Sequence, residues 1–350
     1  MTRSVQPRAE IVATRSHERW TSIYQSMKRQ RMIDEKMVLL QRQGRIGFYG
    51  PITGQEGAAI GSVAALEPRD WVVPALREAA TALYRGLPLD TYIAQLFGNS
   101  GDWIQGRQMP CHHTYRDGNY VAMSSCVGNQ LPCAVGIAMA AQYRKDPVVV
   151  LAYLGDGATS EGDFHSAMNF AGVYKSPVVF FCQNNQWAIS VPAAKQTASK
   201  NFAVKAAAYG FEGVRIDGND AVEVFETTQK AVKKARKGDG PTFIEAVTYR
   251  MGGHTTSDDP ARYRDPKEVE AWAKKDPVDR LRKHLEKNKL WNKQQEKQLE
   301  EEFTTELNAA IERVEKLPPP PLESMFEDVY AVMPPHLQEQ RDQALARHAK

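Results

Sequence analysis

Residues 154–190 read LGDGATSEGDFHSAMNFAGVYKSPVVFFCQNNQWAIS, and this stretch decides the fold. An apolar, β-branched run at 148–154 leads into it, and a second run, Val178–Cys182, lies inside it. Runs this continuous are typical of strands that are buried on both faces of a parallel sheet. Between the runs, Ser160 and Asp163 form a capping-box pattern, and apolar residues then follow at helical spacing. The stretch therefore predicts a β-α-β unit.

Polar groups follow both of these strands. Asp156 comes after the first strand and Asn185 after the second. Because the carboxyl ends of neighbouring parallel strands meet at one end of the sheet, we expect these two residues to face each other. A carboxylate, an amide oxygen and a nearby backbone carbonyl suit Mg²⁺, which keeps its other positions for phosphate and water. Gly155 and Gly157 let a diphosphate approach the backbone, and the helix after Ser160 directs a positive dipole end at it.

Other interpretations of this pattern stay open. Asp156 alone would more often be an ordinary turn residue, and it is the pair Asn184–Asn185 that favours a cofactor site. The chain has no G-x-x-x-x-G-K-[ST] sequence, which excludes a P-loop. From Gly155 the order is G-x-G-x-x-S rather than the dinucleotide G-x-G-x-x-G, and no acidic residue clearly closes a following strand. An NAD-dependent Rossmann dehydrogenase is the first alternative, and a non-catalytic scaffold homologue is the second.

The composition is that of an ordinary globular protein. The 350 residues are 25% charged and 42% hydrophobic, and the formal net charge is +3. A charge this small, without a dense Lys/Arg tract, argues against nucleic acid as a partner. No apolar run reaches the roughly 20 residues that cross a bilayer, so we expect no membrane partner. The four cysteines form no C-x-x-C pair and the first residues show no signal-peptide core, which predicts reduced thiols and a cytoplasmic protein.

The alternation of strands and helices predicts an α/β fold. We expect a doubly wound, mostly parallel sheet of the diphosphate-binding type, with an N-terminal arm and C-terminal helices. Further strands are expected at 71–73, 213–217 and 242–247.

The chain divides into three parts on composition. An N-terminal helical arm covers 1–45, the α/β domain covers 46–265, and charged helices, a spacer and a tail cover 266–350. The spacer contains Pro318–Pro321, which is stiff and extended. The tail beyond it is too short to hold a core, so we expect it to lie on another subunit.

Three loops outside the main stretch carry further candidate residues. Arg77 follows a short strand, where a guanidinium binds a phosphate bidentately or pairs with a neighbouring acid. The turn 124–130 offers hydroxyls and amides to a diphosphate, although its serines are equally suited to capping the next helix. One of the adjacent His112 and His113 is expected to line the pocket. His254, in a Gly-hinged loop, is a candidate proton donor or phosphate ligand.

With these features in place, the chain resembles the α subunits of the decarboxylating component of 2-oxo acid dehydrogenase complexes. A Gly-Asp-Gly joined to a pair of asparagines by this spacing looks like the signature of thiamine diphosphate enzymes. The similarity runs over nearly the whole chain from about Gly47. The segments that resemble the branched-chain, or 2-oxoisovalerate dehydrogenase, type are GRQMP (106–110), FFCQNNQWAIS (180–190), YRMGGHTTSDDPARYR (249–264) and FEDVYAVMPPHL (326–337).

The resemblance implies oxidative decarboxylation of a branched-chain 2-oxo acid, with transfer of the acyl group to a lipoyl-bearing acyltransferase. In this family the α chain holds the diphosphate and Mg²⁺, while a separate β subunit binds the aminopyrimidine and supplies an activating glutamate. Two α with two β chains form the implied assembly. A pyruvate or acetoin dehydrogenase α subunit is the alternative within the family.

The resemblance also implies roles for individual residues. Asp156, Asn185 and the Trp187 carbonyl match Mg²⁺ ligands, and His254 matches the residue beside the reacting centre. A candidate K⁺ site matches Ser124, Cys126, Asn129 and Gln130. The positions implied to contact thiamine diphosphate are Leu76, Arg77, Ser125, Val127, Asp156, Gly157, Ala158, Gln183, Asn185, Trp187, Arg250 and His254.

Several positions depart from the family pattern. Leu76 stands where branched-chain relatives have a tyrosine, Gln183 replaces an arginine at the diphosphate, and Asn129 replaces a threonine at the potassium site. Loss of one charge-assisted bond weakens cofactor binding by about 1.5–3 kcal/mol. Thr255 and Asp265 stand where animal relatives carry regulatory phosphoserines. We therefore expect no kinase switch of that design, and the bacterial cytoplasm rather than the mitochondrial matrix.

Overall fold

A five-stranded parallel sheet forms the centre of the molecule. The computed structural model describes residues 16–348, and its strands are ordered β1-β2-β3-β7-β6 with every pairing parallel. This confirms the predicted doubly wound sheet, including the three strands expected outside the main stretch. The strands are β1 (Trp71–Val73), β2 (Val150–Gly155), β3 (Val178–Asn184), β6 (Glu212–Asp217) and β7 (Thr242–Val247).

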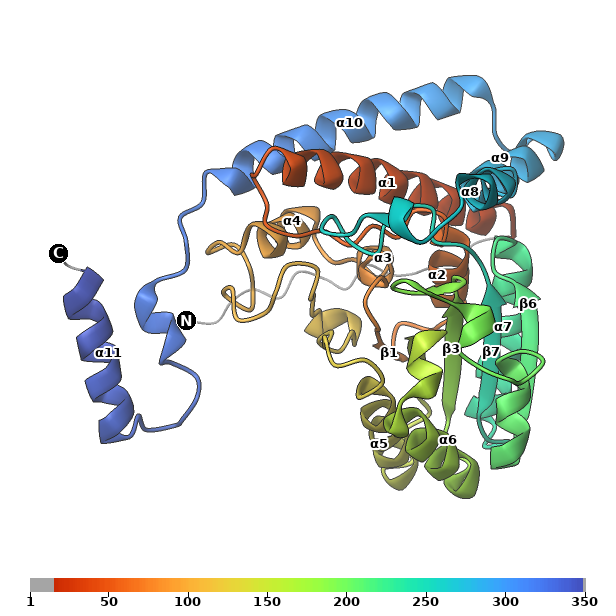
Figure 1. Ribbon diagram of the computed structural model, residues 1–350, viewed down its shortest axis with the longest axis horizontal. Coiled ribbons are helices and arrows are strands. Elements are labelled where there is room, and N and C mark those ends of the chain that lie inside the picture. The colour runs from red at the N-terminus through yellow and green to blue at the C-terminus, as the bar shows by residue number, and fades with distance from the viewer. Residues whose placement is uncertain (1–15, 349–350) are drawn as a thin grey trace.

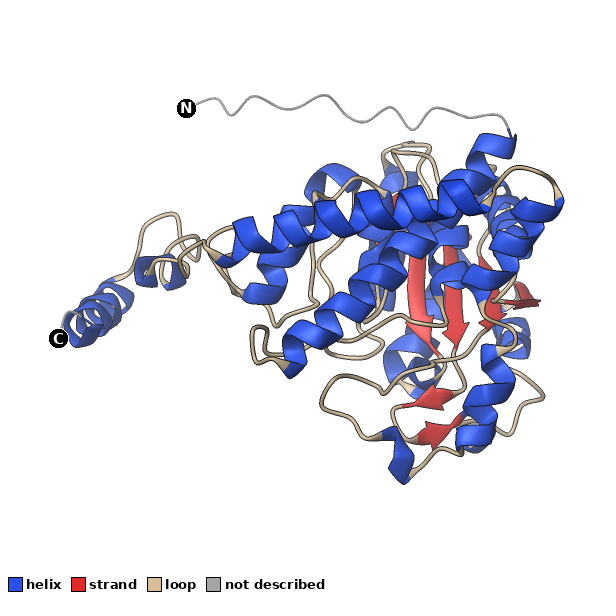
Figure 2. Ribbon diagram, turned by 90° about the horizontal axis from the view of Figure 1, so that it is seen from above, coloured by secondary structure: helices blue, strands red, loops and turns tan. Residues whose placement is uncertain are grey.

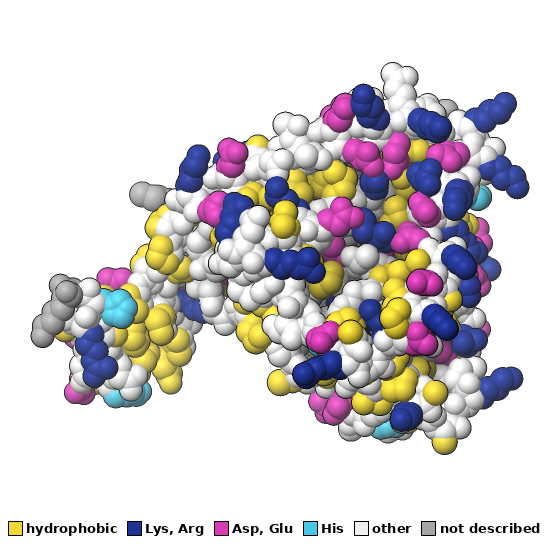
Figure 3. Space-filling view, turned by 45° about the horizontal axis from the view of Figure 1, so that its top comes forward, with side chains coloured by type: hydrophobic (Ala, Val, Ile, Leu, Met, Phe, Trp, Pro, Cys, Tyr) yellow, Lys and Arg dark blue, Asp and Glu magenta, His cyan; other side chains and the backbone are white. Residues whose placement is uncertain are grey.

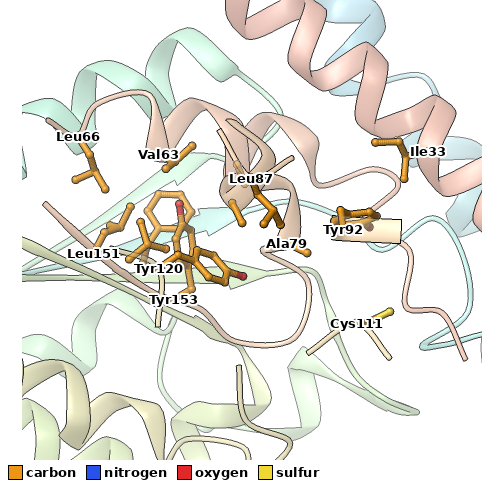
Figure 4. Packing of buried hydrophobic residues seen from close by; sticks show 14 of the residues in the cluster. Ile33, Val63, Leu66, Ala79, Leu87, Tyr92, Cys111, Tyr120, Leu151 and Tyr153 are labelled. Carbon is orange, nitrogen blue, oxygen red and sulfur yellow. The ribbon is translucent and has the colours of Figure 1, made fainter. Parts of the chain in front are cut away.

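Two apolar layers cover the sheet, because successive residues of a strand point to opposite faces. On β2, Leu151 and Tyr153 enter the layer that includes Val63, and these three side chains lie together in Figure 4. Ala152 and Leu154 enter the other layer. The first layer is covered by α2 (Glu56–Val63) and α7 (Ala221–Arg236), and the second by α5 (Gln130–Tyr143) and α6 (Gly162–Tyr174).

The described part of the N-terminal arm, which begins at Ser16, is packed on the body; residues 1–15 of the predicted arm lie outside the described residues. The helix α1 (Ser16–Arg42) contacts α2, α9 (Pro277–Lys287) and α10 (Lys293–Glu315), and its residues Met37 and Leu40 are fully buried. Figure 1 shows α1 and α10 lying side by side across one side of the molecule. Among residues 16–348, no helix has both the length and the apolar character needed to cross a bilayer. The remaining helices are α3 (Ala79–Tyr84), α4 (Leu89–Phe97), α8 (Pro266–Ala273), α9 (Pro277–Lys287) and α10 (Lys293–Glu315).

The C-terminal segment leaves the body after α10. The helix α11 (Pro335–His348) buries none of its residues, and Figure 2 shows it projecting away from the sheet. Apolar side chains are exposed on the way to it, and Figure 3 shows such side chains gathered on the projecting lobe. They include Met325, Val329, Tyr330 and Val332. The tail forms no core of its own, as its length predicted.

The predicted capping box at Ser160 and Asp163 is wrong. Residues Gly157–Ser160 form a separate 3₁₀ turn, and α6 begins only at Gly162. Its N-cap position is Glu161, whose extended backbone ends the 3₁₀ turn and whose side chain makes no capping bond. Ser160, which the pattern assigned to the helix start, instead belongs to the tight turn after Asp156.

Candidate active site

The candidate site lies at the carboxyl ends of β2, β3 and β7. The register pairs Gly155 with Gln183 and Gln183 with Ala246, so these strands end side by side. Asp156 follows β2, Asn185 follows β3, and the Asn185 backbone N–H bonds the Asp156 carboxylate. The structure therefore places these two residues next to each other, as the β-α-β pattern predicted.

Asp156 is a buried acid without a cationic partner. Only 1% of its surface is exposed, and within residues 16–348 no lysine or arginine forms an ion pair with it. Gln196 Nε2 donates to Asp156 Oδ2 at 2.5 Å. Burial raises the pKa of this carboxyl group, while the hydrogen bond from Gln196 opposes the rise. A desolvated carboxylate with amide partners alone is suited to a metal ion.

A short hairpin closes over the turn after Asp156. It consists of β4 (Trp187–Ala188) and β5 (Val191–Pro192). A Cβ on Gly157 would lie 2.7 Å from the Cβ of Ala188, which is closer than real side chains approach. Residue 157 is therefore glycine because the hairpin leaves no room for a side chain. Ala158, the next residue, is buried in the layer beneath α5 and α6.

The other two metal-ligand candidates already take part in hydrogen bonds. Asn185 Oδ1 accepts from the Trp187 backbone N–H at 3.2 Å, and Asn185 Nδ2 donates to Gln55 Oε1 at 3.0 Å. The Trp187 carbonyl accepts from Arg250 Nη1 at 3.2 Å. Each of these oxygens has a second lone pair, so it can also bind an ion. Together with Asp156 they form an oxygen donor set of the kind that Mg²⁺ prefers.

Two buried guanidinium groups, Arg77 and Arg250, lie at this end of the sheet. Arg250 is 1% exposed and donates to two backbone carbonyls and to the Tyr263 hydroxyl. Arg77 is 7% exposed and donates from Nη1 to the Pro51 carbonyl at 2.6 Å. Burial and the charge of Arg250 lower the pKa of Arg77 to about 10. Among the described residues neither has a carboxylate in ion-pair contact, and burying such cations is costly, so the pair indicates an anion site.

His254 lies against Arg77. Arg77 Nη2 donates to the His254 carbonyl at 2.6 Å and lies 3.1 Å from Nδ1. Since a guanidinium only donates, Nδ1 is the acceptor and the ring proton is on Nε2. Burial and the charges of Arg77 and Arg250 lower the pKa of His254 to about 4. The imidazole is therefore neutral at pH 7 and offers Nε2–H as a donor.

A buried pair, Glu78 and Gln183, adds a residue that the sequence did not identify. Gln183 Nε2 donates to Glu78 Oε1, and the backbone N–H groups of Ala75 and Arg77 donate to Oε2 at 2.8 and 3.1 Å. Burial raises the pKa of Glu78 to about 7. Gln183 Oε1 is buried without a partner in the described part of the chain. The two residues are 105 positions apart, so no local pattern links them. The only signal in the sequence was that Glu78 is an acid next to Arg77.

The turn 124–130 passes beside the start of α6. A Cβ on Gly128 would lie 3.0 Å from the Cβ of Glu161. Ser125 and Val127 are exposed, and Ser125 Oγ lies 2.6 Å from His112 Nε2 rather than bonding Asp156. His113 is buried and stacks on Tyr92, so His112 is the histidine that reaches the turn. Leu76 is half-buried beside Arg77.

Three of the candidate potassium ligands lie together. Ser124 Oγ accepts from the Cys126 backbone N–H and from Asn129 Nδ2, both at 3.3 Å. Asn129 Oδ1 is buried and has no partner in residues 16–348, which leaves one free acceptor for a cation. Gln130 Nε2 instead donates to the Tyr153 carbonyl of β2 at 3.0 Å.

Comparison with known proteins identifies the family. The family model described as "Dehydrogenase E1 component" matches residues 24–323. The chain is 43% identical to the 3-methyl-2-oxobutanoate dehydrogenase subunit alpha of Mycobacterium tuberculosis, covering 95% of this chain and 88% of the relative. It is 42% identical to the mitochondrial 2-oxoisovalerate dehydrogenase subunit alpha 2 of Arabidopsis thaliana (93% and 69% covered) and 41% identical to the human mitochondrial subunit alpha (95% and 74%). The chain therefore belongs to the dehydrogenase E1 component family.

Proposed function

We propose that this chain is the α subunit of a thiamine diphosphate-dependent dehydrogenase that decarboxylates branched-chain 2-oxo acids such as 2-oxoisovalerate. The substrate class comes from the names of the relatives given above. The observation that carries the proposal is that two buried guanidiniums, Arg77 and Arg250, form no ion pair within residues 16–348 and that Arg250 lies near the buried carboxylate of Asp156. A diphosphate bound with Mg²⁺ would compensate all three groups together.

The residues present fit this cofactor. Asp156, Asn185 and the Trp187 carbonyl would hold Mg²⁺, while Arg77 and Arg250 would bind the diphosphate. Gly157, whose backbone is partly exposed, and the neighbouring Ala158 would contact the same group through the backbone. The bound cofactor supplies the nucleophilic carbon and the electron sink for decarboxylation. Ser125, Val127, Leu76 and Gln183 complete the proposed contacts, and Ser124, Cys126, Asn129 and Gln130 form the proposed K⁺ site.

His254 is the proposed catalytic residue. Its neutral imidazole is held by Arg77 and carries its proton on Nε2. A neutral ring adds no third positive charge beside the two guanidiniums. Nε2–H can donate to an oxygen of the bound 2-oxo acid and support proton transfer as the acyl group passes to the lipoyl group.

A partner subunit completes the proposed enzyme. The relatives are named as α subunits, and a separate β subunit would bind the aminopyrimidine. Two α with two β chains, served by a lipoyl-bearing acyltransferase, form the proposed complex. The projecting α11 and the exposed Val329, Tyr330 and Val332 are the proposed contact for a second subunit. The bacterial relative supports a bacterial cytoplasmic location.

Two measurements test the proposal. The chain copurified with its β subunit should turn over 2-oxoisovalerate faster than pyruvate; the reverse preference would favour the pyruvate or acetoin alternative. The purified chain should bind thiamine diphosphate with Mg²⁺ and not NAD in calorimetric titrations. NAD binding would favour the Rossmann alternative, and binding of the β subunit without thiamine diphosphate would favour the scaffold alternative.

The Asp156→Ala protein tests the metal assignment. Loss of this carboxylate should abolish Mg²⁺-dependent thiamine diphosphate binding, because the other two ligands are neutral. Asp163→Ala removes an exposed acid from α6 nearby and should leave the affinity unchanged. An Asp156→Ala protein with normal calorimetric affinity would contradict the assignment.

A further inference from the structure

Gln55 is a buried glutamine at the start of α2 whose side chain does not cap the helix. None of its surface is exposed, and it occupies the N-cap position without a side-chain capping bond. A side chain at this position usually accepts a bond from one of the first backbone N–H groups of the helix. Here Gln55 Oε1 instead accepts from Asn185 Nδ2 at 3.0 Å. The side chain is therefore directed at Asn185, which is one of the proposed Mg²⁺ ligands.

The hydrogen bonds of Asn185 determine which end of its amide carries the oxygen. The Trp187 backbone N–H can only donate, so the amide atom 3.2 Å from it is the oxygen, Oδ1. The other end is then the NH₂ group, and Gln55 Oε1 supplies its acceptor. Reversing the amide would set two donors against each other at Trp187 and two acceptors against each other at Gln55. These two partners together therefore keep the Asn185 oxygen on one side.

Gln55 holds this orientation although its own nitrogen has no partner. Gln55 Nε2 is buried without an acceptor in residues 16–348. Reversing the Gln55 amide would set this nitrogen against Asn185 Nδ2, so two donors would again face each other. A buried donor without a partner is unfavourable, and each such group in a native protein calls for an explanation. The explanation here is that an oxygen is needed beside Asn185.

The loop 51–54 fixes the backbone in front of Gln55. Two backbone N–H groups of this loop donate to the buried Asp34 carboxylate, both at 2.8 Å. The Gly54 carbonyl accepts from the Thr248 hydroxyl at 2.9 Å, and Thr248 directly follows β7. Because the loop is held from both sides, Gln55 presents its oxygen to Asn185 from a fixed backbone, as a supporting residue of a binding site must.

We propose that Gln55 is a positioning residue that keeps the Asn185 oxygen available to Mg²⁺. This rests on the proposed function, in which Asn185 binds the metal ion, and Gln55 acts only through Asn185. Outer partners of metal ligands set the orientation of the ligand, and removing one typically lowers metal affinity by about 10- to 100-fold. Gln55 should therefore affect the contribution of Mg²⁺ to cofactor binding, and not the contacts of the diphosphate with arginine side chains.

The factor by which Mg²⁺ strengthens thiamine diphosphate binding measures this role. It is the ratio of the two affinities that calorimetric titration of the full-length chain gives with saturating Mg²⁺ and with EDTA. General damage to the site lowers both affinities and leaves their ratio unchanged, whereas a misoriented metal ligand lowers the ratio. Gln55→Met removes the acceptor at similar volume, so we expect the ratio to fall about tenfold or more. The affinity in EDTA should stay at the wild-type value.

Further variants separate the oxygen beside Asn185 from other properties of a buried glutamine. Gln55→Glu keeps an acceptor and should keep most of the Mg²⁺ effect. The matched control is Gln95→Met, which should leave the ratio unchanged. Gln95 lies on α4, is 2% exposed and donates to the Met109 carbonyl at 2.7 Å, and its Oε1 has no partner among the described residues. If Gln55→Met does not fold, Gln55→Ala removes the same acceptor without adding volume.

Two results would overturn the proposal. One is a wild-type ratio in Gln55→Met, whether or not the two affinities fall together, and the other is an equal loss of the Mg²⁺ effect in Gln55→Glu and Gln55→Met. Both results leave the proposed function intact, because the wild-type chain still binds the cofactor with Mg²⁺. A wild-type chain on which Mg²⁺ has no effect would instead contradict the Mg²⁺ site itself, and with it the role of Gln55.

Discussion

Buried charges at the two ends of the sheet differ in whether they have a partner of opposite charge. At the amino end, Asp70 precedes β1 and is fully buried, and its carboxylate accepts two bonds from Arg236 at 3.0 and 2.7 Å. At the carboxyl end, Arg77 and Arg250 are also buried, but among the described residues they donate only to carbonyls, a hydroxyl and an imidazole. A complete set of partners indicates a structural role. Buried charges left unpaired at the end of the sheet where ligands bind indicate a group that the chain does not itself supply.

The largest effect is expected at the amino end. Asp70→Asn removes the buried charge of a bidentate pair and leaves Arg236 with only the more distant carboxylate of Glu67, at 3.5 Å, so the free energy of unfolding should fall by about 3–5 kcal/mol. Urea unfolding measures this loss. The control is Asp90→Asn, which breaks an equally bidentate pair with Arg313 that is exposed to solvent, and its unfolding midpoint should stay unchanged. Equal losses in both variants would remove the contrast that the comparison relies on.

The second prediction concerns the buried acid at the carboxyl end, Glu78. Its pKa is about 7 in the folded chain against an ordinary 4.5. Between these values the folded chain keeps a proton that the unfolded chain has released, so stability falls as pH rises from about 4.5 to 7 and is level above that. The whole change is roughly 3 kcal/mol. Relative to wild type, Glu78→Gln should become more stable by this amount across that window in pH-dependent urea unfolding, and parallel curves would contradict the prediction.

Arg250→Met tests the expectation for a buried cation without a carboxylate partner, which is the opposite of the large stability loss expected for Asp70→Asn. Thiamine diphosphate affinity should fall by about 1.5–3 kcal/mol, because one charge-assisted contact is lost. The unloaded protein should lose much less stability than Asp70→Asn, since removing a buried, unpaired charge offsets the lost hydrogen bonds. Calorimetry and urea unfolding measure the two effects. Arg144→Met, at an exposed arginine, is the control, and a large stability loss with normal cofactor affinity would reverse the assignment.

The parts of the site that lie next to strands were predictable from sequence. Two continuous apolar runs identified β2 and β3, and parallel pairing then required Asp156 and Asn185 to meet at one end of the sheet. The alternation of strand side chains between two layers follows from the same runs, because both faces of such a sheet are covered. These features were predictable because side chains alternate between the two faces of a strand with a fixed period of two residues.

The partners of these residues were not predictable. Gln196, which bonds Asp156, comes from an irregular segment, and Glu78 meets Gln183 only through the tertiary fold. The hairpin over Gly157 bends at Gln186 and Ile189, whose φ angles are 72° and 55°. Glutamine and isoleucine rarely adopt positive φ angles, so the sequence did not predict these bends. The capping box predicted at Ser160 was wrong for a similar reason. The local pattern suited a helix start, but residues Gly157–Ser160 instead form a 3₁₀ turn that packs against the hairpin.

The smallest effect is expected at Asp34, a buried acid of the carboxyl end that forms no ion pair within residues 16–348 but has a full set of hydrogen-bond donors. Its carboxylate accepts bonds from Gln30, Tyr49, Ile52 and twice from Thr53. Tyr49→Phe removes one of these bonds and also the 3.0 Å hydrogen bond between the Tyr49 and Tyr92 hydroxyls, so we expect a loss of about 1–2 kcal/mol in urea unfolding. Thiamine diphosphate affinity should stay unchanged because the remaining donors hold the loop. If the free energy of unfolding instead fell by as much as in Asp70→Asn, a complete set of neutral donors would be as important to stability as a paired charge. The contrast between the two ends of the sheet would then not hold for Asp34.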